Sequence, residues 1–231
     1  MRLNYQPQSS LEKFAHKVYS VLVENFPRTY YVGGMVRDRL LHKKVTDIDI
    51  ATSATPEQVK RILSARRILF DDHYQNFGII IPKYNKLQAE IASFRKDLPG
   101  SGRYPKVDFV QHPKTDSIRR DFTVNALYFS QISGKILDFH DGLSDLKSKR
   151  LRFIGDPARR IAQDPLRIIR AWRFAGDLGF VLEAKTARAI KNNLYLIERL
   201  TKARLAAEFA KTKKRSTKKF ITSALAKIKN A

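Results

Sequence analysis

The chain has 231 residues, 43% of them hydrophobic, so a packed core can form and wholesale disorder is excluded. It contains no cysteine, which excludes disulfides and cysteine-ligated zinc and fits a reducing cytoplasm. Lys and Arg total 45 against 22 Asp and Glu, a formal net charge of +23, which favours nucleic acid as the partner, with an anionic membrane surface as the alternative.

The first part of the chain alternates between predicted helices and strands. Residues 9–25 have apolar side chains at helical spacing, and Ser9 or Ser10 can cap this helix. Thr55 and Pro56 mark the start of another helix. The other predicted elements of this part are a short helix at 35–41 and strands at 29–32, 46–52, 66–70, 77–84 and 87–95. No apolar run approaches the roughly 20 residues that span a bilayer, so no membrane segment is expected.

The chain becomes helical almost throughout from Asp156 onward. Before that point, a glycine- and proline-rich loop at 96–106 precedes a helix that runs into a strand at 116–130. We therefore predict a mixed α/β part at 1–150, a helical part at 151–210 and a basic tail at 211–231. The tail is either a solvated end of the chain or a contact for a phosphate backbone.

Two carboxylates lie close together in the predicted strand "TDIDIAT". Asp47 and Asp49 are two residues apart, so both point to one face of the strand, while Ile48 and Ile50 point to the other. Such a pair of like charges is tolerated when a divalent cation binds between them. Because the ligands are oxygens, magnesium or manganese is favoured over zinc. The alternative is an acidic pair that faces solvent at a strand edge.

A glycine turn stands shortly before these carboxylates. Gly33 and Gly34 end one strand and start a helix, where free backbone N–H groups can hold an anion. Arg37 follows one turn later and can meet a phosphate or pair with a carboxylate. Glycine turn, arginine and carboxylates together predict a nucleotide triphosphate site. A tight turn that needs positive φ is the simpler interpretation of the two glycines.

Three segments of the chain resemble the class II nucleotidyltransferases. They are "GGMVRDRLL…TDIDIATSATPEQV", "RRDFTVNAL" and "QDPLRIIRAWRFAGDLGF", in the family's order, and the resemblance covers about residues 12–210. The family contains tRNA CCA-adding enzymes and bacterial poly(A) polymerases. The resemblance implies an α/β head of the polymerase-β type, with a mixed sheet, followed by an all-α neck.

The resemblance also implies roles for individual residues in the head. It places the metal-binding pair on Asp47 and Asp49, and the third catalytic carboxylate on Glu90. Its flexible loop matches "RKDLPGSGRYP", in which Arg95 and Arg103 would engage the incoming nucleotide. Two Mg²⁺ ions per site are expected.

Further roles follow from the other two segments. The ribose motif matches Arg119, Arg120, Asp121 and Asn125. Asp121 can accept from ribose hydroxyls, and Arg120 can reach a phosphate. A network of Arg, Asp and Asn that caps a helix is the competing interpretation. In the base-selecting motif Gln163 replaces an acid of the family pattern.

The same motif keeps Asp164 and Arg167, which would bind the Watson–Crick edge of a base. Their spacing predicts one helix face, and an intrahelical ion pair is the alternative.

These expectations define a function. The chain would add CMP and AMP from CTP and ATP to tRNA 3′ ends in the cytoplasm, with pyrophosphate leaving. Two alternatives remain open at this point: a poly(A) polymerase that adds AMP to RNA, and a non-catalytic RNA-binding module. Family members usually continue into body and tail domains, and their loss favours the second alternative. Retention of the motif residues argues against it.

Overall fold

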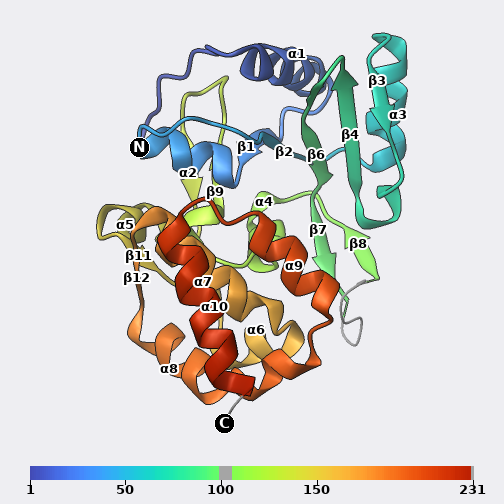
Figure 1. Ribbon diagram of the computed structural model, residues 1–231. Helices are drawn as coiled ribbons and strands as arrows, with labels where there is room; N and C mark the ends of the chain where they lie inside the picture. Colours follow the sequence, from blue (N-terminus) through green and yellow to red (C-terminus); the bar gives the residue numbers. More distant parts are fainter. Residues whose placement is uncertain (99–105, 230–231) are drawn as a thin grey trace. The chain divides into compact units, whose positions relative to one another are not determined.

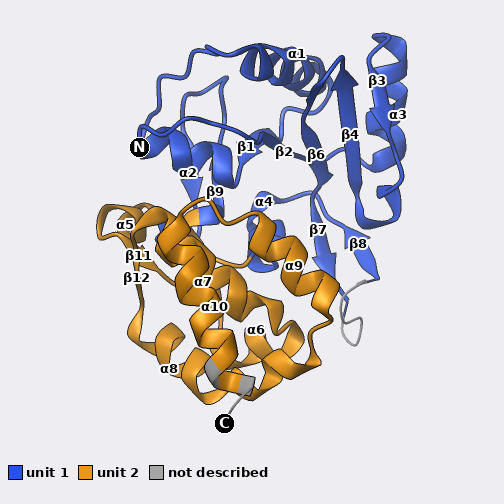
Figure 2. Ribbon diagram, viewed as in Figure 1, with its two compact units in different colours: residues 1–120, 125–142 blue, residues 121–124, 143–231 orange. Residues whose placement is uncertain are grey.

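The computed structural model describes residues 1–98 and 106–229, and the chain forms two compact units. Unit 1 comprises residues 1–120 and 125–142, and unit 2 comprises residues 121–124 and 143–231 (Figure 2). The division therefore falls after Gly142, earlier than the predicted position 150. The short piece 121–124 joins unit 2 because Phe122 stacks on Phe153, with 4.8 Å between ring centroids, and Thr123 donates a hydrogen bond to Asp145.

Unit 1 is built on a mixed sheet, as the resemblance implies (Figure 1). Its strand order is β10-β9-β1-β2-β6-β4-β3, with β5 paired to β4. All neighbours are antiparallel except β2 and β6, which run parallel. The strands are β1 (Thr29–Val32), β2 (Asp49–Thr52), β3 (Leu69–Asp71), β4 (Ile79–Tyr84), β5 (Leu87–Gln88), β6 (Glu90–Ser93), β9 (Leu127–Phe129) and β10 (Ile136–Asp138). A separate ribbon pairs β7 (Arg95–Asp97) with β8 (Val107–Phe109).

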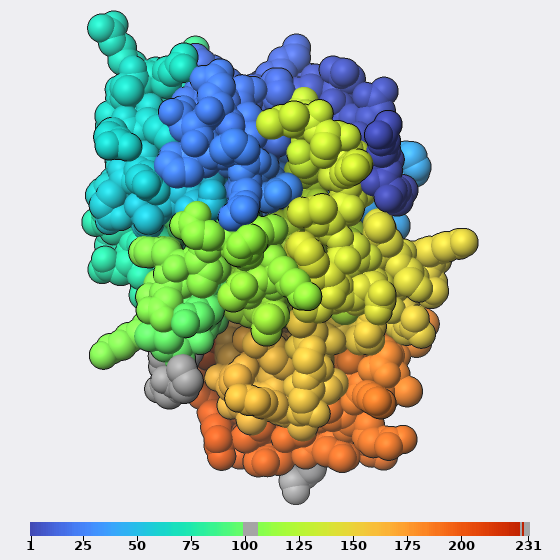
Figure 3. Space-filling model, turned by 180° about the vertical axis from the view of Figure 1, so that it is seen from behind, coloured from blue at the N-terminus to red at the C-terminus, as the bar shows by residue number. Residues whose placement is uncertain are grey.

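The helices of unit 1 begin at the residues that the capping patterns indicate. In α1 (Ser10–Asn25) the cap is Ser9, whose side chain and that of Glu12 form a capping box. In α3 (Pro56–Ala65) Thr55 forms the same motif with Gln58. Both helices pack on the sheet through fully buried residues such as Leu22 and Leu63. The remaining helices are α2 (Gly34–Leu40) and α4 (Pro113–Ile118), and the segment of β8 and α4 is visible at the surface in Figure 3 (green).

Unit 2 is helical with one small parallel pair of strands. Its elements are α5 (Gly142–Lys147), β11 (Arg150–Leu151), α6 (Pro157–Gln163), α7 (Leu166–Leu178), β12 (Val181–Leu182), α8 (Ala184–Asn192), α9 (Lys202–Ala210) and α10 (Arg215–Lys229). The apolar side of α7 is buried at Ile168, Ala171 and Trp172. Within the described residues, no helix has the length and apolarity to cross a membrane.

The segment predicted as a basic tail forms helix α10, which packs against α7. Ile221 is fully buried, and the ring of Phe220 meets that of Trp172 edge to face, with centroids 5.7 Å apart. Gly176 permits this approach, since a Cβ at its position would collide with the Thr217 side chain. The amphipathic pattern of α10 escaped prediction because its many lysines hide a narrow apolar stripe.

Candidate active site

Two carboxylates meet where β2 and β6 run side by side. The parallel register places Asp49 directly opposite Glu90. Side chains at one level of adjacent strands share a face of the sheet. Ile48 and Ile50 are buried, as the predicted alternation requires. The strand begins at Asp49, however, and Asp47 is an exposed residue before it that accepts a hydrogen bond from Thr46 Oγ1 at 3.1 Å.

The electrostatics of this pair are unfavourable without a cation. Burial, followed by the charge of Glu90, raises the pKa of the Asp49 carboxyl well above its ordinary value, and Asp47 acts in the same direction. Arg120 and Arg37 oppose the shift. The site therefore concentrates negative charge on one side and presents two guanidinium groups to it.

The glycine turn contacts the carboxylate directly. Gly33 has φ +74° and is the residue before α2. A Cβ built on it would lie 2.9 Å from Asp49 Oδ2, so only glycine lets the backbone come this close. Gly34 is different, because its Cβ would meet Arg37 Nη2 at 3.5 Å, an ordinary contact. The positive-φ interpretation thus applies to Gly33, and its close approach to Asp49 adds a second constraint.

Arg37 and Asn125 lie together, although the sequence assigns them to different motifs. Arg37 is buried, its Nε donates to Asp38 Oδ1 at 2.8 Å, and its Nη1 donates to Asn125 Oδ1 at 2.5 Å. The guanidinium pairs with a carboxylate, one of the two possibilities that the sequence left open. Asn125 holds Arg37 in place beside the carboxylates.

Arg120 belongs to a network that sequence reasoning missed. Its Nε donates to Tyr128 Oη at 2.9 Å and to Asp116 Oδ2 at 3.2 Å, and Tyr128 Oη donates to Asp116 Oδ2 at 2.6 Å. Arg119 Nε donates to Asp116 Oδ1 at 2.8 Å. Burial alone would raise the pKa of Asp116, but the two arginines and the tyrosine hydrogen bond lower it to about 2. The sequence did contain a signal for this network, because Arg119 and Arg120 follow Asp116 by three and four residues, the spacing of ion pairs on a helix.

Asp121 belongs to the other unit. Its Oδ1 accepts from the backbone N–H of Phe122 at 2.7 Å, and its Oδ2 accepts from Nε of Arg170 at 3.0 Å. Arg170 lies on α7, in the third family motif, but its role as the partner of Asp121 could not be inferred from that spacing. The ribose-binding role of Asp121 stays a prediction.

The predicted base-selecting residues lie at the junction of α6 and α7. Asp164 follows the last residue of α6, and Arg167 is in the first turn of α7, so they do not share one helix as predicted. The ion pair of Asp164 is with Arg204 Nη2, at 2.9 Å to Oδ1. Arg167 Nη1 donates to the carbonyl oxygen of Arg160 at 2.6 Å and to Gln163 Oε1 at 3.1 Å.

Of the two arginines predicted for the flexible loop, the structure describes only Arg95. Arg95 begins β7 and forms an ion pair with Asp97 at 3.5 Å. Burial, followed by the charge of Arg119, lowers the pKa of Arg95 to about 10. Arg103 lies outside the described residues.

The donor chemistry of the site fits magnesium bound together with a substrate. No group of three His, Asp or Glu side chains arranged to hold a metal occurs within residues 1–98 and 106–229. Magnesium usually takes one or two carboxylates and completes its shell with water and substrate phosphates. Burial and the Glu90 charge disfavour the ionised form of Asp49, and a bound cation would offset this unfavourable electrostatic energy.

Comparisons with a family model, with curated sequences and with solved structures all indicate the same family. Residues 29–152 match the poly A polymerase head domain. The CCA-adding enzyme of Lactococcus lactis is 38% identical over 216 residues, which cover 91% of this chain and 52% of that protein. The Bacillus stearothermophilus CCA-adding enzyme in complex with CTP has a TM-score of 0.76 and 32% identity, covering 87% of this chain and 48% of that one.

A third relative was solved with RNA. A tRNA nucleotidyltransferase complexed with a primer tRNA and an incoming ATP analogue has a TM-score of 0.67 and 33% identity, covering 84% of this chain and 55% of that one. This chain spans about half the length of the curated relatives it matches. Because the family match covers more than half of its residues, the chain belongs to the poly A polymerase head-domain family, the class II nucleotidyltransferases that its motifs resemble.

Proposed function

We propose that the protein transfers CMP and AMP from CTP and ATP to the 3′ end of tRNA without a nucleic-acid template. The observation that carries the proposal is the opposed pair Asp49 and Glu90, with Arg120 and Arg37 acting on the same charge. Paired carboxylates next to cationic groups suit a reaction in which a polyanionic triphosphate is cleaved. The relatives solved with CTP and with a tRNA primer support the same chemistry.

The chain's own residues divide the work of this reaction. Asp47 and Asp49 would hold the two Mg²⁺ ions, and Glu90 would be the third catalytic carboxylate. When bound, Mg²⁺ helps to deprotonate the RNA 3′ hydroxyl and neutralises the triphosphate charge. The 3′ oxygen attacks the α-phosphorus, a new phosphodiester bond forms, and pyrophosphate leaves. Arg37 and Arg120 supply positive charge for the phosphates, fixed in place by Asn125 and Asp116.

Substrate choice would depend on unit 2. Asp121 would accept from the ribose hydroxyls, and Asp164 and Arg167 would bind the base edge. A carboxylate accepts and a guanidinium donates. If the carboxylate faces the position of the C N4 or A N6 amino group, the pair favours C and A, because U and G carry a carbonyl oxygen at that position. The absence of cysteine supports a reducing cytoplasm as the site of action.

A poly(A) polymerase is the second candidate, because the matched family model carries that name. One assay separates the candidates: the protein is incubated with Mg²⁺, each labelled nucleotide triphosphate, and either a tRNA that ends before CCA or an unstructured oligonucleotide. CCA addition predicts CMP and AMP incorporation that stops on the tRNA and is weak on the oligonucleotide. Long AMP tracts on both RNAs would identify a poly(A) polymerase. RNA binding without any incorporation would identify a non-catalytic module and overturn the proposal.

A further inference from the structure

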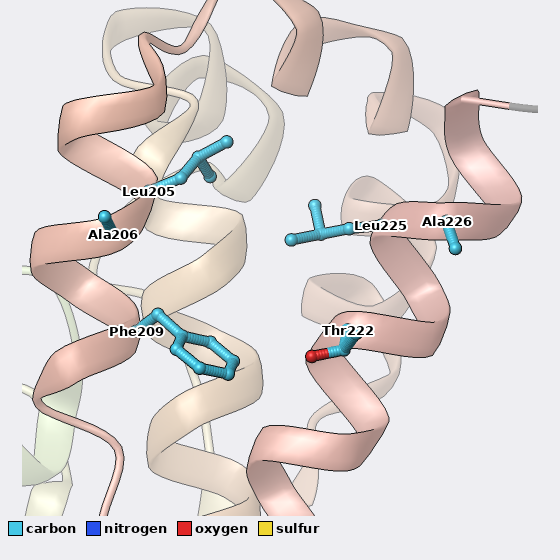
Figure 4. Close-up of a pocket in the computed structure, with 6 residues that line it drawn as sticks. All are labelled: Leu205, Ala206, Phe209, Thr222, Leu225 and Ala226. Carbon is cyan, nitrogen blue, oxygen red and sulfur yellow. The ribbon is translucent and has the colours of Figure 1, made fainter.

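Helices α9 and α10 of unit 2 form the two walls of an open apolar groove. Its volume is about 390 Å³, and the side chains of the two walls face one another across it (Figure 4). Every lining residue is at least partly exposed: Leu205, Ala206 and Phe209 on α9, and Thr222, Leu225 and Ala226 on α10. Apolar side chains that line a recess and stay open to solvent indicate a binding surface.

Packing on α7 holds the two walls apart. On the far side of α9, the buried Glu208 accepts a hydrogen bond from Arg173 Nε of α7 at 2.6 Å. On the far side of α10, Ile221 is fully buried and Thr217 lies against Gly176 of α7. Because each helix is anchored through its other side, the space between them stays open. The groove is therefore formed before any ligand arrives, which favours binding.

The shape of the groove suits another helix. Ala206 and Ala226 have the smallest of the lining side chains, and one stands on each wall. Small side chains let a further helix approach closely. Leu205, Phe209 and Leu225 supply larger apolar contacts. A helix with apolar residues at every third or fourth position is the ligand that such a groove binds.

The edges of the groove are positively charged. Lys202 stands three positions before Leu205 and therefore lies on the same face of α9. Lys218 of α10 places its Nζ 5.9 Å from the centre of the Phe209 ring. The sequence of α10 contains no aspartate or glutamate, and the one acid of α9, Glu208, is buried. The complementary ligand carries carboxylates beside its apolar face.

We propose that this groove is a docking site for an acidic amphipathic helix of a partner protein. Of the six lining side chains only Thr222 has a polar group, and its hydroxyl donates to the carbonyl oxygen of Lys218 at 3.0 Å. An RNA base in the groove would therefore bury its polar edge without hydrogen bonds. A bilayer is bound by apolar side chains that protrude, whereas these line a recess. A second copy of the chain carries the same net charge of +23 and is repelled.

Three labelled synthetic peptides of about 15 residues, roughly four helical turns, test the proposal. The acidic peptide has leucine at every third or fourth position and glutamate at most others. A scrambled peptide keeps this composition but distributes leucine around the helix, and a basic peptide has lysine in place of glutamate. Fluorescence anisotropy with the full chain should show binding of the acidic peptide and at least about tenfold weaker binding of the other two. No binding of the acidic peptide, or equal binding of the scrambled one, would overturn the proposal.

Ala206→Glu and Ala207→Glu form a matched pair of variants. Both alanines are exposed on α9, and each change adds one negative charge. Of the two, Ala206 lines the groove, because the next position of a helix points about 100° away. Ala206→Glu should weaken binding of the acidic peptide by about tenfold or more, whereas Ala207→Glu should change it by less than about threefold. An equal loss in both variants would contradict docking in the groove.

Two further ligands test the other occupants. An unstructured RNA oligonucleotide, and vesicles of phosphatidylcholine with phosphatidylglycerol, should bind the two variants equally. A loss of RNA binding confined to Ala206→Glu would assign the groove to RNA, and the same result with vesicles would assign it to a membrane, so that either result overturns the proposal. Melting temperatures of the same samples show whether the variants fold. Ala226→Glu, exposed on the other wall, repeats the test if Ala206→Glu does not fold.

Discussion

Gly33 shows how a single backbone conformation can build a site. Its φ of +74° and ψ of −136° are accessible to few residues other than glycine, and an added Cβ would lie 2.9 Å from Asp49 Oδ2. Gly34 carries neither constraint and provides the internal comparison. The two adjacent glycines of the turn are therefore not equivalent.

Gly33→Ala should lower the free energy of unfolding by about 1–3 kcal/mol and displace the Asp49 carboxylate, with a loss of nucleotide transfer. Gly34→Ala should be tolerated in both respects, because its Cβ makes an ordinary contact with the end of the Arg37 side chain. Urea unfolding and a transfer assay of both variants measure the difference. Equal behaviour of the two variants would contradict the role given to Gly33.

Asp116 should make unit 1 sensitive to acid. Its pKa falls from 3.8 to about 2 in the folded protein, so the stability it contributes is fully present above pH about 4 and is lost as the pH falls toward 2. Asp116→Asn leaves two arginines without their buried partner and should cost about 3 kcal/mol at neutral pH.

The difference in unfolding free energy between wild type and Asp116→Asn should shrink as the pH is lowered from about 4 to about 2. Asp72→Asn removes an exposed ion pair with Lys60 and should cost less than about 1 kcal/mol at any pH. A pH-independent difference for Asp116→Asn would mean that its ionisation does not stabilise the fold.

Sequence reasoning identified residues that carry a local pattern and missed those defined by distant partners. Strand alternation correctly separated Ile48 and Ile50 from the carboxylates. The contacts between Asp164 and Arg204 and between Asp121 and Arg170 span 40 and 49 positions, and no spacing rule predicts them. Their functional roles stay predictions.

At the level of elements, β2 and β6 determine where the site forms. Their parallel register sets Asp49 opposite Glu90, and the crossover through α3, β3 and β4 makes this pairing possible. Caps and alternation predict the individual elements well because these signals are local. The strand order was not predictable from them, since it depends on long-range pairing.

The basic surface of α10 remains a predicted contact for RNA. Because α10 packs on α7, deleting it would remove part of the core, so charge neutralisation is the cleaner test. The variant replaces three exposed cations at the start of this segment with glutamine: Lys213, Arg215 and Lys219. Its binding of single-stranded RNA should depend less on salt. The slope of log affinity against log salt concentration should change by roughly 0.7 for each lost phosphate contact.

A matched variant neutralises three exposed cations of unit 1, Arg66, Lys83 and Lys86, and removes the same net charge. It should change the slope less than the α10 variant does. Equal slopes for both variants would mean that net charge alone, and not the position of α10, determines the affinity.

At the level of the whole molecule, the family resemblance predicted the two-part organisation but not its details. The mixed sheet and the helical part agree with it, whereas the boundary lies after Gly142 and the C-terminal segment forms a packed helix. Both differences come from tertiary contacts: Phe122 stacks on Phe153, and α10 covers α7.

The central claim is that Asp49 serves catalysis at the expense of stability. Burial and the neighbouring Glu90 charge disfavour its ionised form, so Asp49→Asn should unfold at the same or a higher temperature than the wild type. The decisive measurement is single-turnover transfer of labelled CMP to a tRNA that ends before CCA, with melting and RNA binding followed on the same samples and Asp72→Asn as the control. We predict that Asp49→Asn lowers the rate of transfer by far more than tenfold, where tenfold corresponds to about 1.4 kcal/mol in the activation barrier. The variant should melt at no lower a temperature than the wild type and should bind RNA normally. Transfer within tenfold of the wild type would contradict the assignment of Asp49 to the active site.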